Sequence, residues 1–382
     1  MITYPNQCYI ELTQRCNLKC VHCFAKGSQN ANLPEIQFSD LKKVVSQLEK
    51  LGIYTVNISG GEPTLHNNFF EIIEYLLKFP FRYSILTNGL NWSDEHFRKL
   101  CEIDPDRRLK IQISVDGSFD NMKAMRGINK QEYILLHHNI NEFVSLGFSV
   151  GVLYVANLLT IKDSLNVANE LLFSYNVKGV KIVPMFESGR AIKMEQDIFA
   201  FWDEWSKLVL SVTDIKKHRK WGAKTTKLSL GIFNLYELVV PLDDAGRHQD
   251  IEDVWKLNVN NIELFRKQSN RFHYCEAGFS ELVISSDMKL LPCVAGIRTN
   301  QIIGDLRKES ILKLWKNSDL LNWYRNDLVN VTKQQPCSDC NYKELCSGGC
   351  RLNAMSASLS KYEPDPRCPL VLRYNKEVRN EL

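Results

Sequence analysis

The chain has 382 residues, a formal net charge of +4, and 44% hydrophobic and 24% charged residues. This composition is typical of a soluble globular protein, and the length allows one large domain plus a smaller one. The Lys and Arg residues are scattered, which argues against nucleic-acid binding. No stretch approaches the roughly 18 apolar residues of a membrane span, and the first residues lack a signal-peptide pattern. We therefore expect a cytoplasmic protein with neither a nucleic-acid nor a membrane partner.

Extended and helical patterns alternate along the first half of the chain. The expected strands are 8–13, 54–59, 83–89, 109–117, 148–157 and 178–186. Helical patterns lie between them at 39–51, 69–77, 94–103, 131–146 and 161–175. Six strand–helix units predict an α/β fold with a parallel sheet. Six units suit an incomplete barrel better than a complete one.

Unusual residues follow each expected strand. They are Cys16, the run 60–62, the pairs 88–89 and 116–117, Asn157, and the run 188–190. Gly and Asn are also ordinary turn residues, so each position has a simple structural explanation. In a parallel barrel, however, the carboxyl ends of the strands converge on one face, where active sites form. The six positions together favour a functional site.

The alternation ends near residue 196. The stretches "FWDEWSKLVL" and "IEDVWKLNVNNIELF" have helical patterns and are separated by a polar stretch containing "PLDDAG". We expect a barrel over 1–195, a bridging helical segment over 196–272 and a cysteine-rich domain over 273–372. The bridging segment is either a plain linker or part of a substrate cleft, and its sequence does not decide between these.

Twelve cysteines in a chain without an export signal predict metal binding rather than disulfides. Cys16, Cys20 and Cys23 form a C-x3-C-x2-C motif after the first strand. Three thiolates can hold three irons of a [4Fe–4S] cube and leave the fourth iron open. A zinc site that includes His22 is the alternative. Adjacent His22 and Cys23 would chelate one ion awkwardly, which disfavours zinc.

The motif "CNLKCVHC" resembles the signature loop of the radical S-adenosylmethionine (radical SAM) enzymes. "SGGEPTL" at 59–65, "ISVDG" and "PMFESGRA" resemble later strand ends of that family, so the likeness covers 8 to about 192. The resemblance implies a partial (β/α)6 TIM-like barrel that binds SAM at the open iron. One electron then cleaves SAM, and the 5′-deoxyadenosyl radical that forms abstracts a substrate hydrogen.

The resemblance also assigns cofactor contacts. The methionine amino group of SAM would be received by Gly60, Gly61 and Glu62, since glycine allows close approach and a carboxylate complements a cation. The candidates for ribose and carboxylate contacts are Asn88, Ser114 and Arg126. Position 22 is usually aromatic in the family, and His22 departs from that pattern. No catalytic base or hydrogen-atom donor is assigned.

The tail resembles the seven-cysteine SPASM domain, a small α+β domain found behind many radical SAM peptide and protein maturases. The likeness runs from about 274 to 370 and includes "CEAGFSELVISSDMKLLPC", in which Met288 replaces the usual glycine, and "IIGDLRKESILKLW". The resemblance implies two auxiliary [4Fe–4S] clusters, which makes three clusters in the chain. An outer set of ligands would be Cys337, Cys340, Cys346 and Cys368. An inner set would be Cys275, Cys293 and Cys350.

The inner set lacks a fourth ligand. Its fourth site is either open, for instance to a substrate thiolate, or filled by a residue that the sequence does not reveal. Two structural zinc sites are the alternative for the tail, with His273 as an eighth ligand. The remaining cysteines, Cys8 and Cys101, fit core packing. Of these two, only Cys8 could lie near the barrel interior as a hydrogen-atom donor.

These features predict a radical SAM/SPASM oxidoreductase that modifies a peptide, such as a RiPP precursor (a ribosomally made peptide that is later modified), or a protein side chain. A thioether or another cross-link would be a typical product. Val294, directly after the second tail cysteine, argues against sulfatase-type oxidation. The alternatives are dehydrogenation of a small molecule such as an amino sugar, and a non-catalytic metal-binding module. Expected partners are the substrate, an electron donor such as flavodoxin or ferredoxin, and a separate peptide-recognition protein.

Overall fold

The computed structural model describes residues 4–30, 32–186, 188–193, 197–269, 273–297, 299–358 and 360–380. Within these ranges one sheet of ten strands has the order β10-β9-β8-β1-β2-β3-β4-β5-β6-β7. The strands are β1 Gln7–Glu11, β2 Thr55–Ser59, β3 Arg82–Thr87, β4 Leu109–Ser114, β5 Ser149–Ala156, β6 Gly179–Pro184, β7 Leu228–Leu230, β8 Glu281–Ile284, β9 Lys289–Leu291 and β10 Gly304–Asp305. Barrel and tail therefore share a single sheet.

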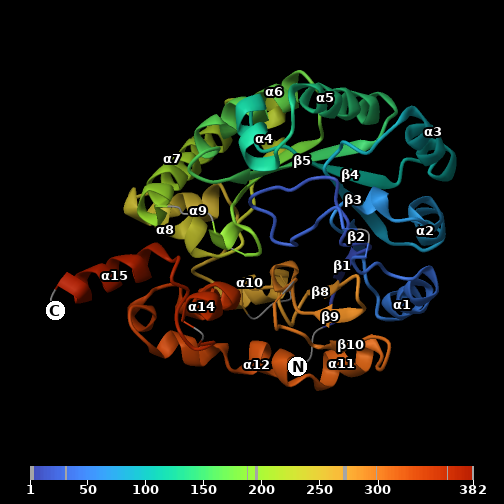
Figure 1. The fold of residues 1–382 in the computed structure, drawn as a ribbon. Coiled ribbons are helices and arrows are strands. Elements are labelled where there is room, and N and C mark those ends of the chain that lie inside the picture. Colours follow the sequence, from blue (N-terminus) through green and yellow to red (C-terminus); the bar gives the residue numbers. More distant parts are fainter. Residues whose placement is uncertain are drawn as a thin grey trace.

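Strands β1 to β6 are the six predicted strands, and each pairs with the next in parallel. The helices that connect them run along the outside of the curved sheet (Figure 1). They are α1 Phe38–Lys50, α2 Phe69–Leu76, α3 Asp94–Ile103, α4 Phe119–Arg126, α5 Lys130–Ser145 and α6 Ser164–Phe173. Ser93 accepts a hydrogen bond from the backbone N of His96 and so caps α3 at its predicted start. The predicted partial barrel is confirmed.

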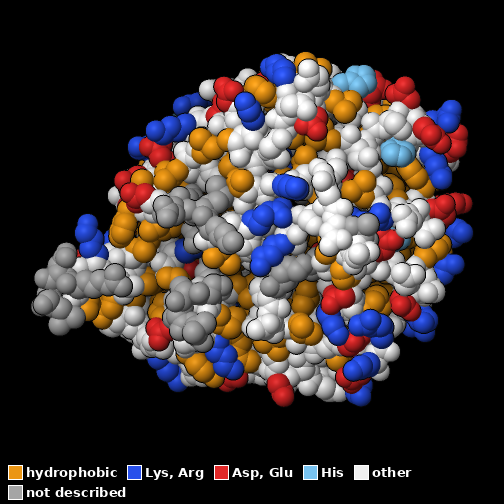
Figure 2. Space-filling view, viewed as in Figure 1, with side chains coloured by type: hydrophobic (Ala, Val, Ile, Leu, Met, Phe, Trp, Pro, Cys, Tyr) orange, Lys and Arg blue, Asp and Glu red, His pale blue; other side chains and the backbone are white. Residues whose placement is uncertain are grey.

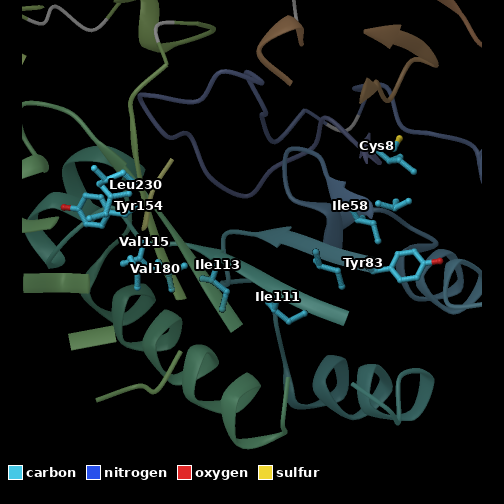
Figure 3. Close-up of a cluster of buried hydrophobic side chains, with 14 of the residues drawn as sticks. Cys8, Ile58, Tyr83, Ile111, Ile113, Val115, Tyr154, Val180 and Leu230 are labelled. Atoms are coloured by element: carbon cyan, nitrogen blue, oxygen red, sulfur yellow. The ribbon is translucent and has the colours of Figure 1, made fainter. Parts of the chain in front are cut away.

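The two faces of the barrel strands differ in burial. Along β5 every second residue, from Val150 to Ala156, is buried, and the residues between them are half-buried. Figure 3 shows the buried face, where side chains such as Tyr83 and Ile113 point toward the helices. The Tyr83 hydroxyl donates to the Leu76 carbonyl of α2. Because side chains alternate along a strand, the half-buried face must line the inside of the barrel.

The bridging segment is not entirely helical. It contains α7 Ile198–Lys217, α8 Tyr236–Asp244, α9 Gln249–Asp253 and α10 Ile262–Ser269. Between α7 and α8, strand β7 pairs in parallel with β6. The polar stretch expected between two helices instead forms the end of α8 and the turn after it. A strand of three residues is too short to show a two-residue period, so the sequence did not reveal β7.

The cysteine-rich tail continues the sheet on the other side of β1. Strand β8 pairs in parallel with β1, and β9 and β10 follow as antiparallel strands. The tail helices are α11 Ile311–Asn317, α12 Asp319–Asn326, α13 Lys343–Cys346, α14 Arg351–Ser358 and α15 Pro369–Asn380. In Figure 1 this part, orange to red, lies beneath β1 and the loop that follows it. The division at 195 and 272 remains a prediction, because the sheet runs across both boundaries.

Among the described residues, no helix has both the length and the apolar character needed to cross a bilayer.

Candidate functional site

The loop after β1 carries the first three cysteines and packs closely on itself. The backbone N of Cys16 donates to the Ser28 carbonyl at 2.8 Å. A Cβ on Gly27 would lie 3.0 Å from the Cβ of Cys16, so the loop closes on a glycine. Cys16 and Cys20 are buried and Cys23 is half-buried. The structure thus brings the three predicted ligands together in one loop.

The three thiols influence one another. Burial raises the pKa of Cys16 to about 12, and the nearby charges of Glu62, Cys20 and Cys23 add to that rise. Burial likewise raises the pKa of Cys20. As free groups, Cys16 and Cys20 would stay neutral thiols. Iron binding would deprotonate them, so the donor set suits a group that carries positive charge into this loop.

Gly60 and Gly61 follow β2 and touch the cysteine loop. A Cβ on Gly60 would lie 2.7 Å from the Thr13 carbonyl oxygen, and one on Gly61 would lie 2.3 Å from that of Arg15. The backbone N of Gly61 donates to the Thr13 carbonyl at 2.7 Å. In the structure these glycines admit the backbone of the loop after β1. Their predicted contact with SAM remains a prediction.

Glu62 is completely buried beside these glycines. Its carboxylate accepts hydrogen bonds of 2.8 Å from the hydroxyls of Thr64 and Thr87 and from the backbone N of Asn88. Burial raises the pKa of Glu62 in spite of these bonds. The Asn88 side chain donates to Asn17 of the cysteine loop at 2.7 Å. Glu62 and Asn88 therefore join the ends of β2 and β3 to that loop. The sequence did not single out Asn17, Thr64 or Thr87.

Arg126 lies at the end of α4 and reaches the same loop. Its Nε donates to Asp116 Oδ2 at 2.7 Å, and its Nη1 lies 3.9 Å from Cys20 Sγ. Burial opposes ionisation of Asp116, but Arg126 and His22 outweigh that effect and hold its pKa below the usual range. Ser114, the third predicted contact, is half-buried as the last residue of β4. Ser114 thus ends β4, and Arg126 at the end of α4 contacts Asp116 just beyond the same strand; the cofactor roles of Ser114 and Arg126 remain predictions.

His22 projects toward Asp116, with its Nε2 3.3 Å from Asp116 Oδ2. Burial lowers the pKa of His22 to about 4, and Asp116 opposes that effect. The ring is therefore neutral at neutral pH. Asp116 orients both His22 and Arg126, although the sequence had marked it only as one of several residues at strand ends.

The end of β6 completes the enclosure of the cysteine loop. Arg190 donates to the carbonyls of Cys20 and Gly27, both at 2.8 Å. A Cβ on Gly189 would lie 2.3 Å from the Phe24 carbonyl oxygen, and this glycine has φ of +65°. Asn157, at the end of β5, accepts from the backbone N of Leu159 and so serves its own turn. Most of the predicted strand ends converge on this loop, as expected for a barrel site.

The outer set of tail cysteines lies together. Burial raises the pKa of Cys346, and the neighbouring Cys368, Cys340 and Cys337 raise it further. All four line one cavity, which α8 also borders.

The inner set is separate. Burial is the main cause that raises the pKa of Cys293. The charges of Glu281, Cys275 and Cys350, in this order, raise it further. Cys350 thus interacts with Cys275 and Cys293, which are far from it in the sequence, as the resemblance implied. The fourth site of the inner set stays open as a question.

Within the described ranges, no three His, Cys, Asp or Glu side chains are grouped tightly around one ion position. In a four-iron cube each thiolate binds a different iron, so its ligands stand further apart than those of a single ion. His273, the suggested eighth zinc ligand, has its Nδ1 2.6 Å from the Ser347 hydroxyl. Cys8 is fully buried in the apolar layer of Figure 3, which fits core packing.

Two family models match the chain. The radical SAM superfamily model matches residues 10–163, which include the cysteine loop, and the SPASM model, described as an iron-sulfur cluster-binding domain, matches 275–341. The mycofactocin maturase MftC of Mycolicibacterium smegmatis is 24% identical over 94% of this chain and 81% of that protein. The AdoMet-dependent heme synthase of Methanosarcina barkeri is 24% identical over 96% of this chain and 97% of that protein.

A solved structure shares the fold. Streptococcus suis SuiB, bound to the precursor peptide SuiA, superposes with a TM-score of 0.74 and 19% identity over 96% of this chain and 76% of that one. The motif matches, the barrel with its cysteine loop, and the adjoining cysteine-rich tail agree with one another. The chain is therefore a radical SAM enzyme with a C-terminal SPASM domain.

Proposed function

We propose that this enzyme oxidatively modifies a side chain of a peptide, forming a thioether or another cross-link, with SAM and three [4Fe–4S] clusters as cofactors. The observation that carries the proposal is the separation of ten cysteines into three sets, with Cys350 apart from its sequence neighbours. MftC is named as a maturase, and SuiB was solved with a precursor peptide. These similarities support a peptide substrate for this chain.

Cys16, Cys20 and Cys23 would hold the SAM-binding cluster. When bound, the cluster and SAM supply a 5′-deoxyadenosyl radical that removes a substrate hydrogen. We assign the methionine amino group to residues 60–62 and the remaining polar groups of SAM to Asn88, Ser114 and Arg126. Through its bonds to Thr87 and Asn88, Glu62 fixes the two strand ends that face this cofactor.

The half-buried inner face of the barrel would receive the substrate. Removal of one hydrogen atom leaves an unpaired electron on the substrate, and forming a cross-link requires the loss of one more electron and of a proton from the second side chain. The inner and outer sets would hold the clusters that accept that electron. Because β8 pairs with β1, the β8–β9 hairpin that Cys275 and Cys293 flank belongs to the same sheet as the barrel. This continuity supports an electron acceptor on the tail side of the barrel.

An external donor must reduce the SAM-binding cluster, and we propose a flavodoxin or ferredoxin. Lys19 and Lys26 are exposed on the cysteine loop. Figure 2 shows Lys and Arg side chains at the centre of the face that this loop crosses in Figure 1. Basic side chains there would attract an acidic donor protein. A separate peptide-recognition protein and a cytoplasmic location, where donors of this kind work, complete the proposal.

The test is turnover with a peptide encoded beside the gene. Anaerobically reconstituted enzyme, SAM and a reductant should form 5′-deoxyadenosine and remove two hydrogens from the peptide for each cross-link. Mass spectrometry of both products measures this, and enzyme with Cys16, Cys20 and Cys23 changed to Ala is the control. Formation of 5′-deoxyadenosine with every neighbouring peptide left unchanged would contradict the peptide proposal.

A second candidate is a small-molecule oxidation. The similarity to the heme synthase extends over nearly the whole of both chains, and that protein's name indicates a tetrapyrrole product. Turnover of a porphyrin or an amino sugar under the same conditions, with no peptide modified, would favour this candidate.

A further inference from the structure

Asp365 is a fully buried carboxylate in the cysteine-rich tail. Its Oδ2 accepts hydrogen bonds from the Tyr236 hydroxyl at 2.8 Å, from the backbone N of Cys350 at 2.8 Å and from the Asn353 side chain at 3.2 Å. Its Oδ1 accepts from the backbone N of Arg367 at 3.0 Å. Four donors thus converge on one carboxylate and compensate its removal from water.

The backbone of Asp365 is bonded to Cys368 of the outer set and to the segment between Cys346 and Cys350. Its N donates to the Gly348 carbonyl at 2.8 Å, and its carbonyl accepts from the N of Cys368 at 3.1 Å. Gly349, in the left-handed region with φ of +81°, packs so closely that a Cβ on it would lie 2.5 Å from the Cβ of Asp365. The carboxylate is therefore fixed between Cys350 of the inner set and Cys368 of the outer set.

The charge of Asp365 acts on both sets. Burial is the main cause that raises the pKa of Cys350 and of Cys368, to about 12 each, and Asp365 raises both further. It also raises the pKa of Cys337 and Cys346, after burial and the neighbouring thiols. A fixed charge in this position opposes any added negative charge at either set, and the interior screens it only weakly.

Arg351 carries the opposite charge nearby. Its buried guanidinium donates to backbone carbonyls, including that of Glu363 at 2.6 Å. It lowers the pKa of Cys337 and Cys275, where burial is the larger and opposing cause. Asp365 thus raises and Arg351 lowers the pKa of tail cysteines, and Asp365 affects more members of the outer set.

We propose that Asp365 sets the reduction potentials of both auxiliary clusters, by placing one fixed negative charge between their ligand sets. This inference rests on the proposed function, which requires two clusters in the tail. Reduction adds an electron, so a nearby negative charge lowers the potential. Asp365 is a positioning residue in this role, because it touches the ligands and not the substrate.

Tyr236 provides a second variant, for which the expected shift of the reduction potentials has the opposite sign. Its hydroxyl belongs to α8 of the bridging segment and directs its hydrogen at Asp365. Removing that donor leaves the negative charge of the carboxylate less compensated, while the three other donors remain in place. Tyr236→Phe should therefore lower the potentials, whereas Asp365→Asn should raise them.

The experiment is a redox titration of the full chain with Cys16, Cys20 and Cys23 changed to Ala. Electron paramagnetic resonance measures the reduced clusters at each potential. This background leaves only the auxiliary clusters. Asp365→Asn should raise both midpoints and make the reduced-to-oxidised ratio at a fixed potential about tenfold larger, about 59 mV for a one-electron couple. Tyr236→Phe should shift both midpoints the other way by less. Asp339→Asn is the matched control, since Asp339 neighbours Cys340 but is exposed.

Unchanged midpoints in Asp365→Asn with full iron content would overturn the inference. If Asp365→Asn loses iron, Tyr236→Phe decides, and unchanged or raised midpoints there would overturn it. A failure of the proposed function would give a different experimental result from a failure of this inference. The background protein itself would then contain iron for fewer than two auxiliary clusters.

Discussion

Glu11, the last residue of β1, accepts hydrogen bonds from both the backbone N and the hydroxyl of Ser286, at 2.9 and 2.7 Å. Ser286 lies in the turn between β8 and β9, so these bonds connect the barrel to the cysteine-rich tail. Glu11 is almost completely buried, and a buried carboxylate that loses a donor is costly. The junction of the two regions thus depends on one residue pair as well as on strand pairing.

Ser286→Ala removes the hydroxyl donor and keeps the backbone donor. We expect a loss of about 1–2 kcal/mol in the free energy of unfolding, because the Glu11 carboxylate keeps only part of its hydrogen bonding. Denaturant titration of the reconstituted protein measures this. The control is Thr332→Ala, whose hydroxyl makes only a local bond to the Val329 carbonyl. Equal stability of both variants would show that the Glu11 contact contributes nothing.

Met288 occupies a left-handed backbone position, with φ of +64°, a conformation that favours glycine. Met288→Gly should relieve about 1–2 kcal/mol of backbone strain. It should also lose about 2–3 kcal/mol of apolar burial, because the side chain is only 5% exposed. Glycine adds further entropy to the unfolded chain. We expect net destabilisation by about 1–2 kcal/mol. Lys256→Gly, at an exposed left-handed position, should be nearly neutral.

Glu62→Gln replaces one carboxylate oxygen by an NH2 group, which would face either the hydroxyls of Thr64 and Thr87 or the backbone N of Asn88. The mismatch should cost about 1.5–3 kcal/mol, which corresponds to roughly tenfold to hundredfold weaker SAM binding if the site must close around these strand ends. Equilibrium binding of SAM to the reconstituted enzyme tests this. Glu71→Gln, exposed on α2, is the control. Unchanged SAM affinity would remove Glu62 from the cofactor site.

Glu281 predicts a pH dependence of stability. Burial raises its pKa to about 8, and Glu276 adds to this rise. A carboxyl whose pKa is raised in the folded state contributes its full stabilisation of the fold when the pH is below its pKa in the unfolded chain. That contribution is lost as the pH rises to about 8. Relative to the parent, Glu281→Gln should therefore gain stability between about pH 5 and 8, by up to about 1.4 kcal/mol per pH unit. Glu263→Gln, an exposed site, should show a flat difference.

Cys350 tests the division of the tail cysteines. Cys350→Ala should remove about four irons of the inner cluster and leave the outer one, whereas Cys340→Ala should do the reverse. Iron analysis and the two distinct resonance signals separate these results. The two residues lie close in the sequence, so loss of the same signal in both variants would contradict the assignment.

Much of the barrel could be read from local patterns. Alternation over β5 and the Ser93 cap of α3 involve residues within a few positions, and such signals depend little on the rest of the chain. The cysteine loop could also be predicted from the sequence, because its three cysteines lie within eight residues of one another. The resemblance marked the glycines at 60 and 61 as sites of close approach for SAM, and only the structure showed that the backbones of Thr13 and Arg15 are their neighbours.

The sequence by itself therefore determined the six barrel strands and the helices between them except α4, the cysteine motifs and the family. The tertiary structure alone decided that β7 extends the barrel, that β8 adjoins β1, and that Asp116 and Asp365 hold the ligand loops. Those contacts join residues up to 275 positions apart, as Glu11 and Ser286 do. No local period encodes such a pairing. It arises only when the packed chain brings buried polar groups to the partners that satisfy them.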